Sequence, residues 1–400
     1  MKITVLTNEY PPHIYGGAGV HVEYLTKEFV ALEAGEIQVL SFGDQNVYDG
    51  RLSVEGVTAE TKLDAQDPRH AKVLDTLQRD LIMAGKAEAS DIVHCHTWYT
   101  HFAGCLVKQL QGAKLVLTTH SLEPHRPWKV EQLGSAYHVS SWLERTAFQN
   151  ADGVVAVSRA MKRDVHELYN VPNEKIAVVP NGIDPDEYKP TFDEAVLKKY
   201  GVDPKKPFVL FVGRITRQKG ILHLANALKY LPDDTQVVLC AGAPDTPEIG
   251  EEMAGRIEAA RQAGAERVVW VEQMVPREDI IKLYSHAAVF VCPSVYEPFG
   301  IINLEAMACE TPVVASAVGG IPEIVVPGET GTLVPFEVRE NFEPEDPEGF
   351  ARDLAAAITD LLSDPERLEK MGRASRERVE ERFSWRAVAE ETLDFYRSLL

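Results

Sequence analysis

The sequence lacks the features that mark several common classes of protein. No run of 18 apolar residues occurs, so we expect no membrane-spanning helix. The Walker pattern G-x-x-x-x-G-K-[ST] and the hydrolase pattern G-x-S-x-G are both absent. The five cysteines are scattered, and none forms C-x-x-C, which favours reduced, buried thiols over disulfides or a zinc knuckle. The first residues lack the length and cleavage site of a signal peptide, so we expect a cytoplasmic protein.

The chain is also poor in positive charge. It has 41 Lys and Arg against 61 Asp and Glu, which gives a net charge of −20. Such an acidic surface argues against nucleic acid or an anionic membrane as a partner. An anionic substrate would therefore need a local cluster of cations. The sequence predicts no oligomeric state.

Short apolar runs alternate with helical patterns along the whole chain. Many runs are continuous Val, Ile and Leu, as in parallel strands that are covered on both faces. This alternation predicts an α/β protein with two Rossmann-like, doubly wound parallel sheets. We expect strands at 3–6, 37–41, 91–95, 115–119, 154–157, 177–179, 208–212, 236–240, 268–271, 289–292 and 313–315. A proline-rich polar stretch after Asp184 predicts one domain over 1–184 and another over 185–384.

Two cations follow a predicted strand of the second domain, in the segment F-V-G-R-I-T-R-Q-K-G. Ligands of open α/β sheets bind beyond the carboxyl ends of the strands. Arg214 and Lys219 would converge there on a diphosphate, with Gly213 and Gly220 letting the backbone approach. The alternative is a solvated basic turn.

Two carboxylates lie in the segment Y-E-P-F-G-I-I-N-L-E, at Glu297 and Glu305. Helical geometry throughout would separate them by ~12 Å, at ~1.5 Å per residue. This exceeds the ~5–10 Å of glycosidase carboxylate pairs, and suits the two ends of one extended ligand. Gly300 and Ile301 lie near a predicted helix N-terminus, which favours an anion. Otherwise Glu297 is a helix-dipole partner and Glu305 an exposed helix residue.

The first domain begins with a glycine-rich loop at Gly16 and Gly17. The G-x-G-x-x-G fingerprint fails, which argues against NAD, and the loop is either a phosphate or sugar contact or a flexible turn. His94, His96 and His101 lack a nearby acidic third ligand, so we expect no metal and a structural or substrate-facing His96.

His120 ends a further predicted strand, where it would bond a sugar hydroxyl or be a satisfied core residue. His125, Arg126 and Lys129 then form a second basic cluster. In an acidic protein this indicates either a second phosphate site or a solvated loop.

Taken together, these motifs resemble the retaining glycosyltransferases of the GT-B fold, over essentially the whole chain. The likeness extends to bacterial glycogen synthases of the actinobacterial type. It depends on G-R-x-x-x-x-K-G, on Glu-x7-Glu, and on the segments Y-P-P-H-I-Y-G-G-A-G-V-H, H-T-W-Y, T-H-S-L-E-P-H-R-P-W-K and P-N-G-I-D. The chain departs from the enterobacterial branch, which has Lys-Thr-Gly-Gly and E-P-C-G where this sequence has Ile14–Gly17 and Phe299.

The resemblance implies a role for each candidate residue. Arg214 and Lys219 would neutralise the leaving diphosphate, which fits a metal-independent enzyme with no cofactor. His120 and Glu297 would hold the glucose, and Glu305 the ribose. The donor site would be completed by Gly16, Gly17, Phe299, Gly300 and Ile301. The acceptor side would include Glu9, His96, His125, Arg126 and Lys129. The last helix, 385–400, would pack on the acceptor-side first domain.

The implied function is retaining transfer of glucose from ADP-glucose to an α-1,4-glucan. One alternative is transfer to glucose 1-phosphate, which gives α-maltose 1-phosphate. A nucleotide-sugar epimerase and a non-catalytic nucleotide-sugar-binding protein are alternatives from other classes. The residues do not distinguish ADP-glucose from UDP-glucose.

Overall fold

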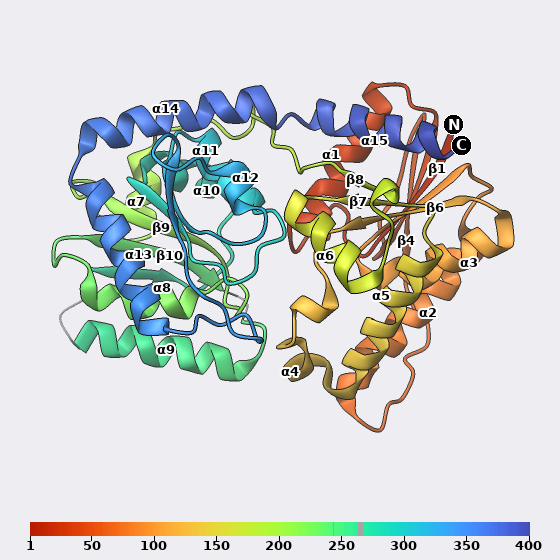
Figure 1. The fold of residues 1–400 in the computed structure, drawn as a ribbon, viewed down its shortest axis with the longest axis horizontal. Coiled ribbons are helices and arrows are strands. Elements are labelled where there is room, and N and C mark those ends of the chain that lie inside the picture. Colours follow the sequence, from red (N-terminus) through yellow and green to blue (C-terminus); the bar gives the residue numbers. More distant parts are fainter. Residues whose placement is uncertain (243, 263–266) are drawn as a thin grey trace. The chain divides into compact units, whose positions relative to one another are not determined.

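The chain folds into two compact α/β units (Figure 1). The computed structural model describes residues 1–242, 244–262 and 267–400. Unit 1 comprises Met1–Gly182 and Trp385–Leu400, and unit 2 comprises Ile183–Ser384. The boundary falls two residues before the position predicted from the proline-rich stretch, and residues 385–400 belong to unit 1 as expected.

Unit 1 is built on an eight-stranded sheet with the order β3-β4-β2-β1-β5-β6-β7-β8. Every pair is parallel except β3 with β4. The strands are β1 (Lys2–Thr7), β2 (Glu36–Phe42), β3 (Asn46–Asp49), β4 (Leu52–Val57), β5 (Ile92–His96), β6 (Lys114–Thr119), β7 (Gly153–Ala156) and β8 (Ile176–Val178).

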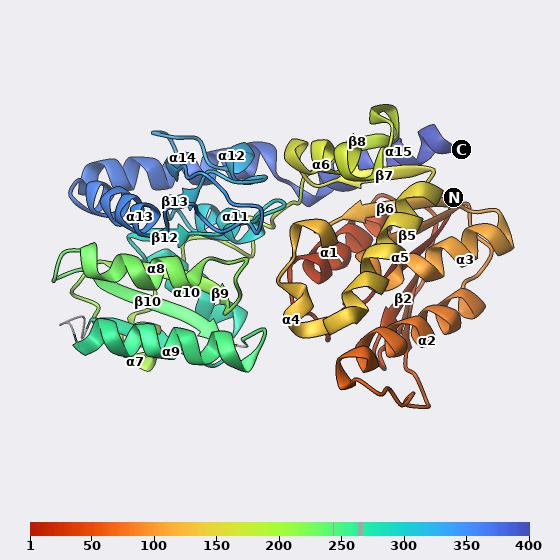
Figure 2. The same cartoon turned by 60° about the horizontal axis from the view of Figure 1, so that its bottom comes forward.

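Helices cover both faces of this sheet (Figures 1 and 2). One face carries α1 and α15, and the other carries α2, α3 and α5. The helices of unit 1 are α1 (Gly17–Ala31), α2 (Ala71–Lys86), α3 (His101–Gln111), α4 (Lys129–Leu133), α5 (Tyr137–Asn150), α6 (Arg159–Tyr169) and α15 (Trp385–Leu399).

Trp385 attaches the last helix to unit 1. Its ring stacks on Tyr24 of α1, with the centroids 5.3 Å apart, and its side chain is 4% exposed. A Cβ added to Gly182 would meet the indole at 2.6 Å, so the absence of a side chain at 182 makes room for this ring. The sequence therefore closes unit 1 with a segment more than 200 residues away along the chain.

Unit 2 contains a six-stranded, all-parallel sheet with the order β11-β10-β9-β12-β13-β14. Its strands are β9 (Phe208–Arg214), β10 (Gln236–Gly242), β11 (Val268–Val271), β12 (Val289–Cys292), β13 (Val313–Ser316) and β14 (Gly331–Val334). Its helices are α7 (Glu194–Lys199), α8 (Ile221–Ala227), α9 (Pro247–Gln262), α10 (Arg277–His286), α11 (Ile301–Ala308), α12 (Ile321–Ile324), α13 (Pro347–Leu362) and α14 (Pro365–Arg382).

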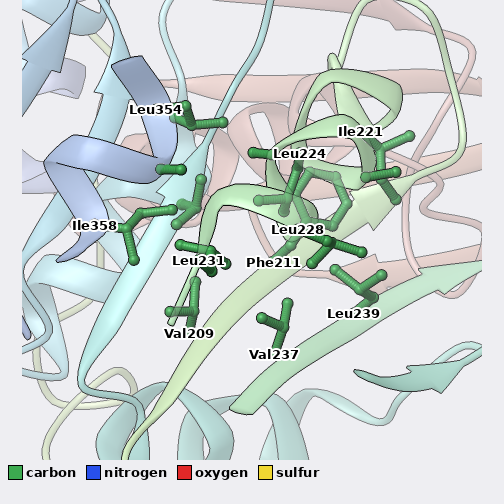
Figure 3. Close-up of a cluster of buried hydrophobic side chains, with 14 of the residues drawn as sticks. Val209, Phe211, Ile221, Leu224, Leu228, Leu231, Val237, Leu239, Leu354 and Ile358 are labelled. Carbon is green, nitrogen blue, oxygen red and sulfur yellow. The ribbon is translucent and has the colours of Figure 1, made fainter. Parts of the chain in front are cut away.

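The core of unit 2 lies between the sheet and α8, α9 and α13. Figure 3 shows Val209 and Phe211 of β9 packed with Leu224 of α8 and Ile358 of α13. Successive residues of β9 point to opposite faces, and both faces are buried, which explains the continuous apolar run.

Three strands of the structure were not predicted from the sequence. All of β3 is exposed, so Asn46–Asp49 has no apolar run to indicate a strand. In β4 and β14 the buried residues are separated by partly exposed ones, and each strand contains a glycine. Their pairing with a neighbouring strand, and not a local pattern, makes these segments extended.

In the described part of the chain, no helix is both long and apolar enough to cross a membrane.

We predict that Trp385→Ala destabilises unit 1 by about 3–5 kcal/mol, because a large buried aromatic leaves a cavity when truncated. Calorimetry would show a lower melting temperature than for the unchanged protein. The matched control is Trp142→Ala. Because Trp142 of α5 is 59% exposed, this substitution should reduce the stability little. Equal losses for the two variants would contradict the role given to Trp385.

Candidate active site

The candidate site of unit 2 lies where its strand order reverses. The chain runs outward from β9 through β10 to β11, then returns to the other side of β9 as β12. Ligands of open α/β sheets bind at the carboxyl ends of the two strands that flank such a switch point. Here those ends lead into the loop 215–220 after β9 and the loop 293–300 after β12.

These two loops are joined through their backbones. The amide of Val295 donates to the carbonyl of Gln218 at 3.0 Å. A Cβ on Gly220, whose φ is +62°, would meet the carbonyl oxygen of Pro293 at 1.9 Å. Only glycine fits this contact, so the cation-bearing loop and the carboxylate-bearing loop are held together as one surface.

Lys219 and Glu297 form an ion pair across this junction. The Lys219 ammonium donates to Oε2 of Glu297 at 2.7 Å, and the Glu297 side chain is 7% exposed. Burial lowers the pKa of Lys219, but the charge and the hydrogen bond of Glu297, together with the nearby Cys292, outweigh this effect, so the pKa lies above its ordinary value. The lysine therefore stays charged, as a ligand for phosphate requires.

Arg214 ends β9 and points its guanidinium at Asp245. Nη1 of Arg214 and Oδ1 of Asp245 are 2.9 Å apart, and the arginine side chain is 49% exposed. The Arg214 charge lies near enough to lower the pKa of Lys219, although Glu297 outweighs this effect. The predicted pair of cations is thus brought together, and the side chain of Arg214 is half exposed.

Glycines also fix the backbone of Glu297. The amide of Gly320 donates to the Glu297 carbonyl at 2.9 Å. Gly319 has a φ of +54°, and a Cβ there would meet that same carbonyl oxygen at 2.0 Å. The segment after β13 therefore determines where Glu297 lies.

Helix α11 begins beside Glu297, as predicted. Gly300 is its N-cap residue with a φ of +108°, and Ile301 is its first residue. The first N–H groups of a helix have no partner within it, which makes this end suitable for an anion. The side chain of Phe299 is 3% exposed and packs against Phe383, so only its backbone is available to a donor.

Glu305 lies on the second turn of α11 between two tyrosines. Oε1 accepts a hydrogen bond from Tyr188 at 3.3 Å, and Oε2 accepts one from Tyr284 at 3.1 Å. Burial raises the pKa of Glu305, and the two hydroxyls and the charge of Lys219 offset this only in part. Two phenol hydroxyls therefore hold the carboxylate in place.

Unit 1 has a site of its own at its switch point, between β1 and β5. His96 ends β5, His120 follows β6, and His21 comes from α1. Nδ1 of His96 and Nε2 of His120 are 3.0 Å apart, and the ring centroids of His21 and His120 are 4.9 Å apart. Burial lowers the pKa of His96 and His120 well below the ordinary value and that of His21 to about 4. All three rings are therefore neutral at pH 7.

The same trio could hold a metal ion by its geometry. One nitrogen from each of His21, His96 and His120 lies within 4.8 Å of the others, and no other described group meets this condition. Two of the rings already share a hydrogen bond, and Nδ1 of His21 is bonded to Asn181 at 2.6 Å. Neutral, polar rings of this kind also suit sugar hydroxyls.

In the glycine-rich loop, a carboxylate of the same unit binds two of the backbone amides. Gly16 is the N-cap residue of α1. However, Oε2 of Glu9 accepts from the amides of Tyr15 and Gly16, both at 2.8 Å. A phosphate that bound the amides of Tyr15 and Gly16 would have to displace the Glu9 carboxylate.

The second basic cluster is supported by buried acids. Nη1 of Arg126 donates to Oγ of Ser121 at 3.2 Å. The same nitrogen lies 3.8 Å from Oε1 of Glu123, whose carboxylate is fully buried. Burial and the neighbouring Glu123 raise the pKa of Glu144 to about 8, so this buried pair carries less than two charges at pH 7. Nδ1 of His125 lies 3.4 Å from Oδ2 of Asp164. The ammonium of Lys129 donates to Oε1 of Gln132 at 2.8 Å.

Several residues of these sites were not predicted. Asp245, Tyr188 and Tyr284 belong to segments that no motif marks, and only the fold brings them to Arg214 and Glu305. Ser294 donates to Glu297 at 2.9 Å, and its position three residues before that carboxylate was the one available signal. His21 was visible in the segment G-G-A-G-V-H, but nothing there indicates its contact with Asn181.

Comparison with known proteins agrees with this geometry. Residues 192–378 match the family model "Glycosyl transferases group 1", and residues 15–187 match "Glycosyltransferase Family 4". The alpha-maltose-1-phosphate synthase of Mycolicibacterium smegmatis is 46% identical over 405 residues, covering 100% of both chains.

The chain belongs to the GT-B glycosyltransferases. A glycogen synthase of Mycobacterium tuberculosis is 29% identical and covers 99% of this chain and 94% of its own. Among solved structures, the sucrose-phosphate synthase of Thermosynechococcus elongatus matches with a TM-score of 0.79 and 25% identity. That match covers 100% of this chain and 99% of the other. The predicted fold and family are confirmed.

We predict that Gly319→Ala impairs glycosyl transfer, because the new methyl group displaces the backbone of Glu297. Gly328→Ala is the matched control, since its φ is +79° but nothing lies within 4 Å of the added Cβ. Both variants should bear the strain of a left-handed backbone, about 1–2 kcal/mol. Kinetics with a nucleotide sugar should show a loss in Gly319→Ala only, and equal activities would refute the argument.

Proposed function

We propose that this glycosyltransferase moves glucose from ADP-glucose to glucose 1-phosphate, with retention, and so forms α-maltose 1-phosphate. The observation that carries the proposal is the Lys219–Glu297 pair beside Arg214 at a switch point, in a chain 46% identical throughout to an alpha-maltose-1-phosphate synthase. The glycogen synthase relative is only 29% identical in sequence. This favours the alternative acceptor over the glucan that the motifs first indicated.

The donor would bind in unit 2. Lys219 and Arg214 supply two positive charges for the diphosphate, and the first amides of α11 add donors. Glu297, held next to Lys219, would accept hydrogen bonds from glucose hydroxyls. Glu305 would exchange its two tyrosine hydroxyls for those of the ribose.

The acceptor phosphate would bind to the basic cluster of unit 1. Arg126 is anchored by Ser121 and the buried Glu123, which fixes its guanidinium at little further entropic cost. His120 and His96 present neutral imidazoles for sugar hydroxyls. A phosphorylated monosaccharide matches a site that combines cations with uncharged polar rings.

In the proposed step the bond between glucose C1 and the diphosphate oxygen breaks as the bond from C1 to the acceptor hydroxyl oxygen forms. The departing diphosphate takes the hydroxyl proton, and attack on the same face retains the α configuration. The products are ADP and α-maltose 1-phosphate. Arg214 and Lys219 stabilise the charge that develops on the leaving group, the task that a metal ion performs in other transferases.

Product analysis tests the proposal directly. The enzyme is incubated with ADP-glucose or UDP-glucose, and with glucose 1-phosphate or a maltooligosaccharide. We expect ADP release and a phosphorylated disaccharide. An isomerised donor in the absence of acceptor would indicate an epimerase, and calorimetric binding without turnover would indicate a binding protein; either result overturns the proposal.

We predict that Arg214→Ala or Lys219→Ala lowers kcat/KM about 100-fold, as expected for the loss of a preorganised charge that stabilises the transition state. Arg373→Ala is the control, because Arg373 of α14 forms an exposed pair with Glu369. Steady-state release of ADP measures the effect. Normal turnover by the Arg214 or Lys219 variant would argue against the donor assignment.

The acceptor assignment gives a separate prediction. The double variant Arg126→Ala/Lys129→Ala should raise the KM for glucose 1-phosphate at least 10-fold and change activity with maltooligosaccharide little, because only the first acceptor carries a phosphate. The control Lys27→Ala/Arg51→Ala removes two exposed charges from the same unit. Equal loss with both acceptors would show that the cluster does not bind phosphate.

A further inference from the structure

The hydroxyl of Ser294 is fully buried and contacts the carboxylate of Glu297, which is proposed to bind the donor sugar. Ser294 lies two residues beyond the end of β12 and is 0% exposed. Its Oγ donates to Oε2 of Glu297 at 2.9 Å. Most side-chain hydrogen bonds in proteins are made to the backbone or to water. The hydrogen bond from Ser294 to a buried carboxylate therefore indicates that this hydroxyl positions Glu297.

The two donors of Glu297 converge on one oxygen. Lys219 and Ser294 both bond to Oε2, and within the described part of the chain Oε1 receives no hydrogen bond. Two donors on one oxygen restrict the rotation of the carboxylate more than one donor does. The arrangement leaves Oε1 as the acceptor that a sugar hydroxyl can use.

The position of Ser294 is itself fixed by its neighbours in sequence. The carbonyl of Pro293 lies against Gly220, and the amide of Val295 bonds to Gln218. Sγ of Cys292 lies 3.5 Å from Oγ of Ser294. Burial and the nearby Glu297 raise the pKa of Cys292, so it is a neutral thiol that can donate to the hydroxyl oxygen.

Lys219 alone would not keep the Glu297 carboxylate in one orientation during the reaction. An ammonium group is a point charge with three rotatable donors, and it would be shared with the diphosphate once the donor binds. The hydroxyl of Ser294 carries no charge and has no attraction for phosphate of comparable strength. Its bond to Glu297 therefore persists in the loaded site.

We propose that Ser294 is a positioning residue, which holds the Glu297 carboxylate so that Oε1 faces the glucose of the donor. This inference rests on the proposed function, because it assigns the bound sugar to Glu297. It extends that function by naming a residue that acts only through Glu297 and touches no phosphate.

The test compares Ser294→Ala with Ser375→Ala. Ser375 is also 0% exposed and belongs to the same unit, but its hydroxyl bonds to the carbonyl of Thr330. We expect Ser294→Ala to lower kcat/KM for ADP-glucose about 10-fold, in the range for one hydrogen bond to a charged group. The affinity for ADP, which has no glucose, should stay within about 2-fold in calorimetry. Ser375→Ala should keep normal kinetics.

A double-mutant cycle separates positioning from general stability. In a Glu297→Gln background, Ser294→Ala should cause little further loss, because its effect passes through the carboxylate. Should Ser294→Ala not fold, Ser294→Cys replaces the hydroxyl by a weaker donor of similar shape and should show the same pattern. Wild-type kinetics in a folded Ser294 variant, or losses that multiply in the double variant, would overturn the inference.

The outcome is distinguishable from failure of the proposed function. If the wild-type enzyme makes no α-maltose 1-phosphate, the proposed function fails. The role of Ser294 is then decided by calorimetry alone, from the ratio of ADP-glucose to ADP affinity in the Ser294 and Ser375 variants. An unchanged ratio in the Ser294 variant would refute it.

Discussion

The ion pair between Lys219 and Glu297 is the interaction on which the proposed chemistry depends. Burying two charges costs more free energy than their attraction returns unless further hydrogen bonds complete the site. Ser294 supplies one such bond, and Gly220, Gly319 and Gly320 bring the backbones into place. The pair is therefore evidence for function more than for stability, since an apolar pair would fill the same space at lower cost.

The two units present different chemical surfaces at their switch points. Unit 2 offers fixed charges of both signs, which suit a diphosphate and the hydroxyls of a sugar. In unit 1, burial keeps His21, His96 and His120 neutral, so this part of the unit is polar without charge. A separate loop, with Arg126 next to the Glu123–Glu144 pair, would provide the charge for the proposed anionic acceptor.

Sequence reasoning succeeded where a pattern is local. Every predicted strand corresponds to a strand of the structure, because a segment buried on both faces is apolar at most of its positions. It failed for β3, which is wholly exposed, and it did not indicate that Glu9 binds the amides of Tyr15 and Gly16. The packing of Phe299 against Phe383 was also missed, because this contact joins segments that are far apart along the chain.

The sequence by itself determined the two-unit α/β architecture and the approximate place of the domain boundary, and it singled out Arg214, Lys219, Glu297 and Glu305 as candidates. Strand patterns and motif spacings depend on residues that are neighbours in the chain. Only the tertiary structure decided that Asp245 pairs with Arg214, that two tyrosines hold Glu305 and that Ser294 shares one oxygen of Glu297 with Lys219. Hydrogen bonds depend on direction and on distances of a few tenths of an ångström. Such distances are set by how separate strands and loops pack, and the order of residues along the chain does not contain them.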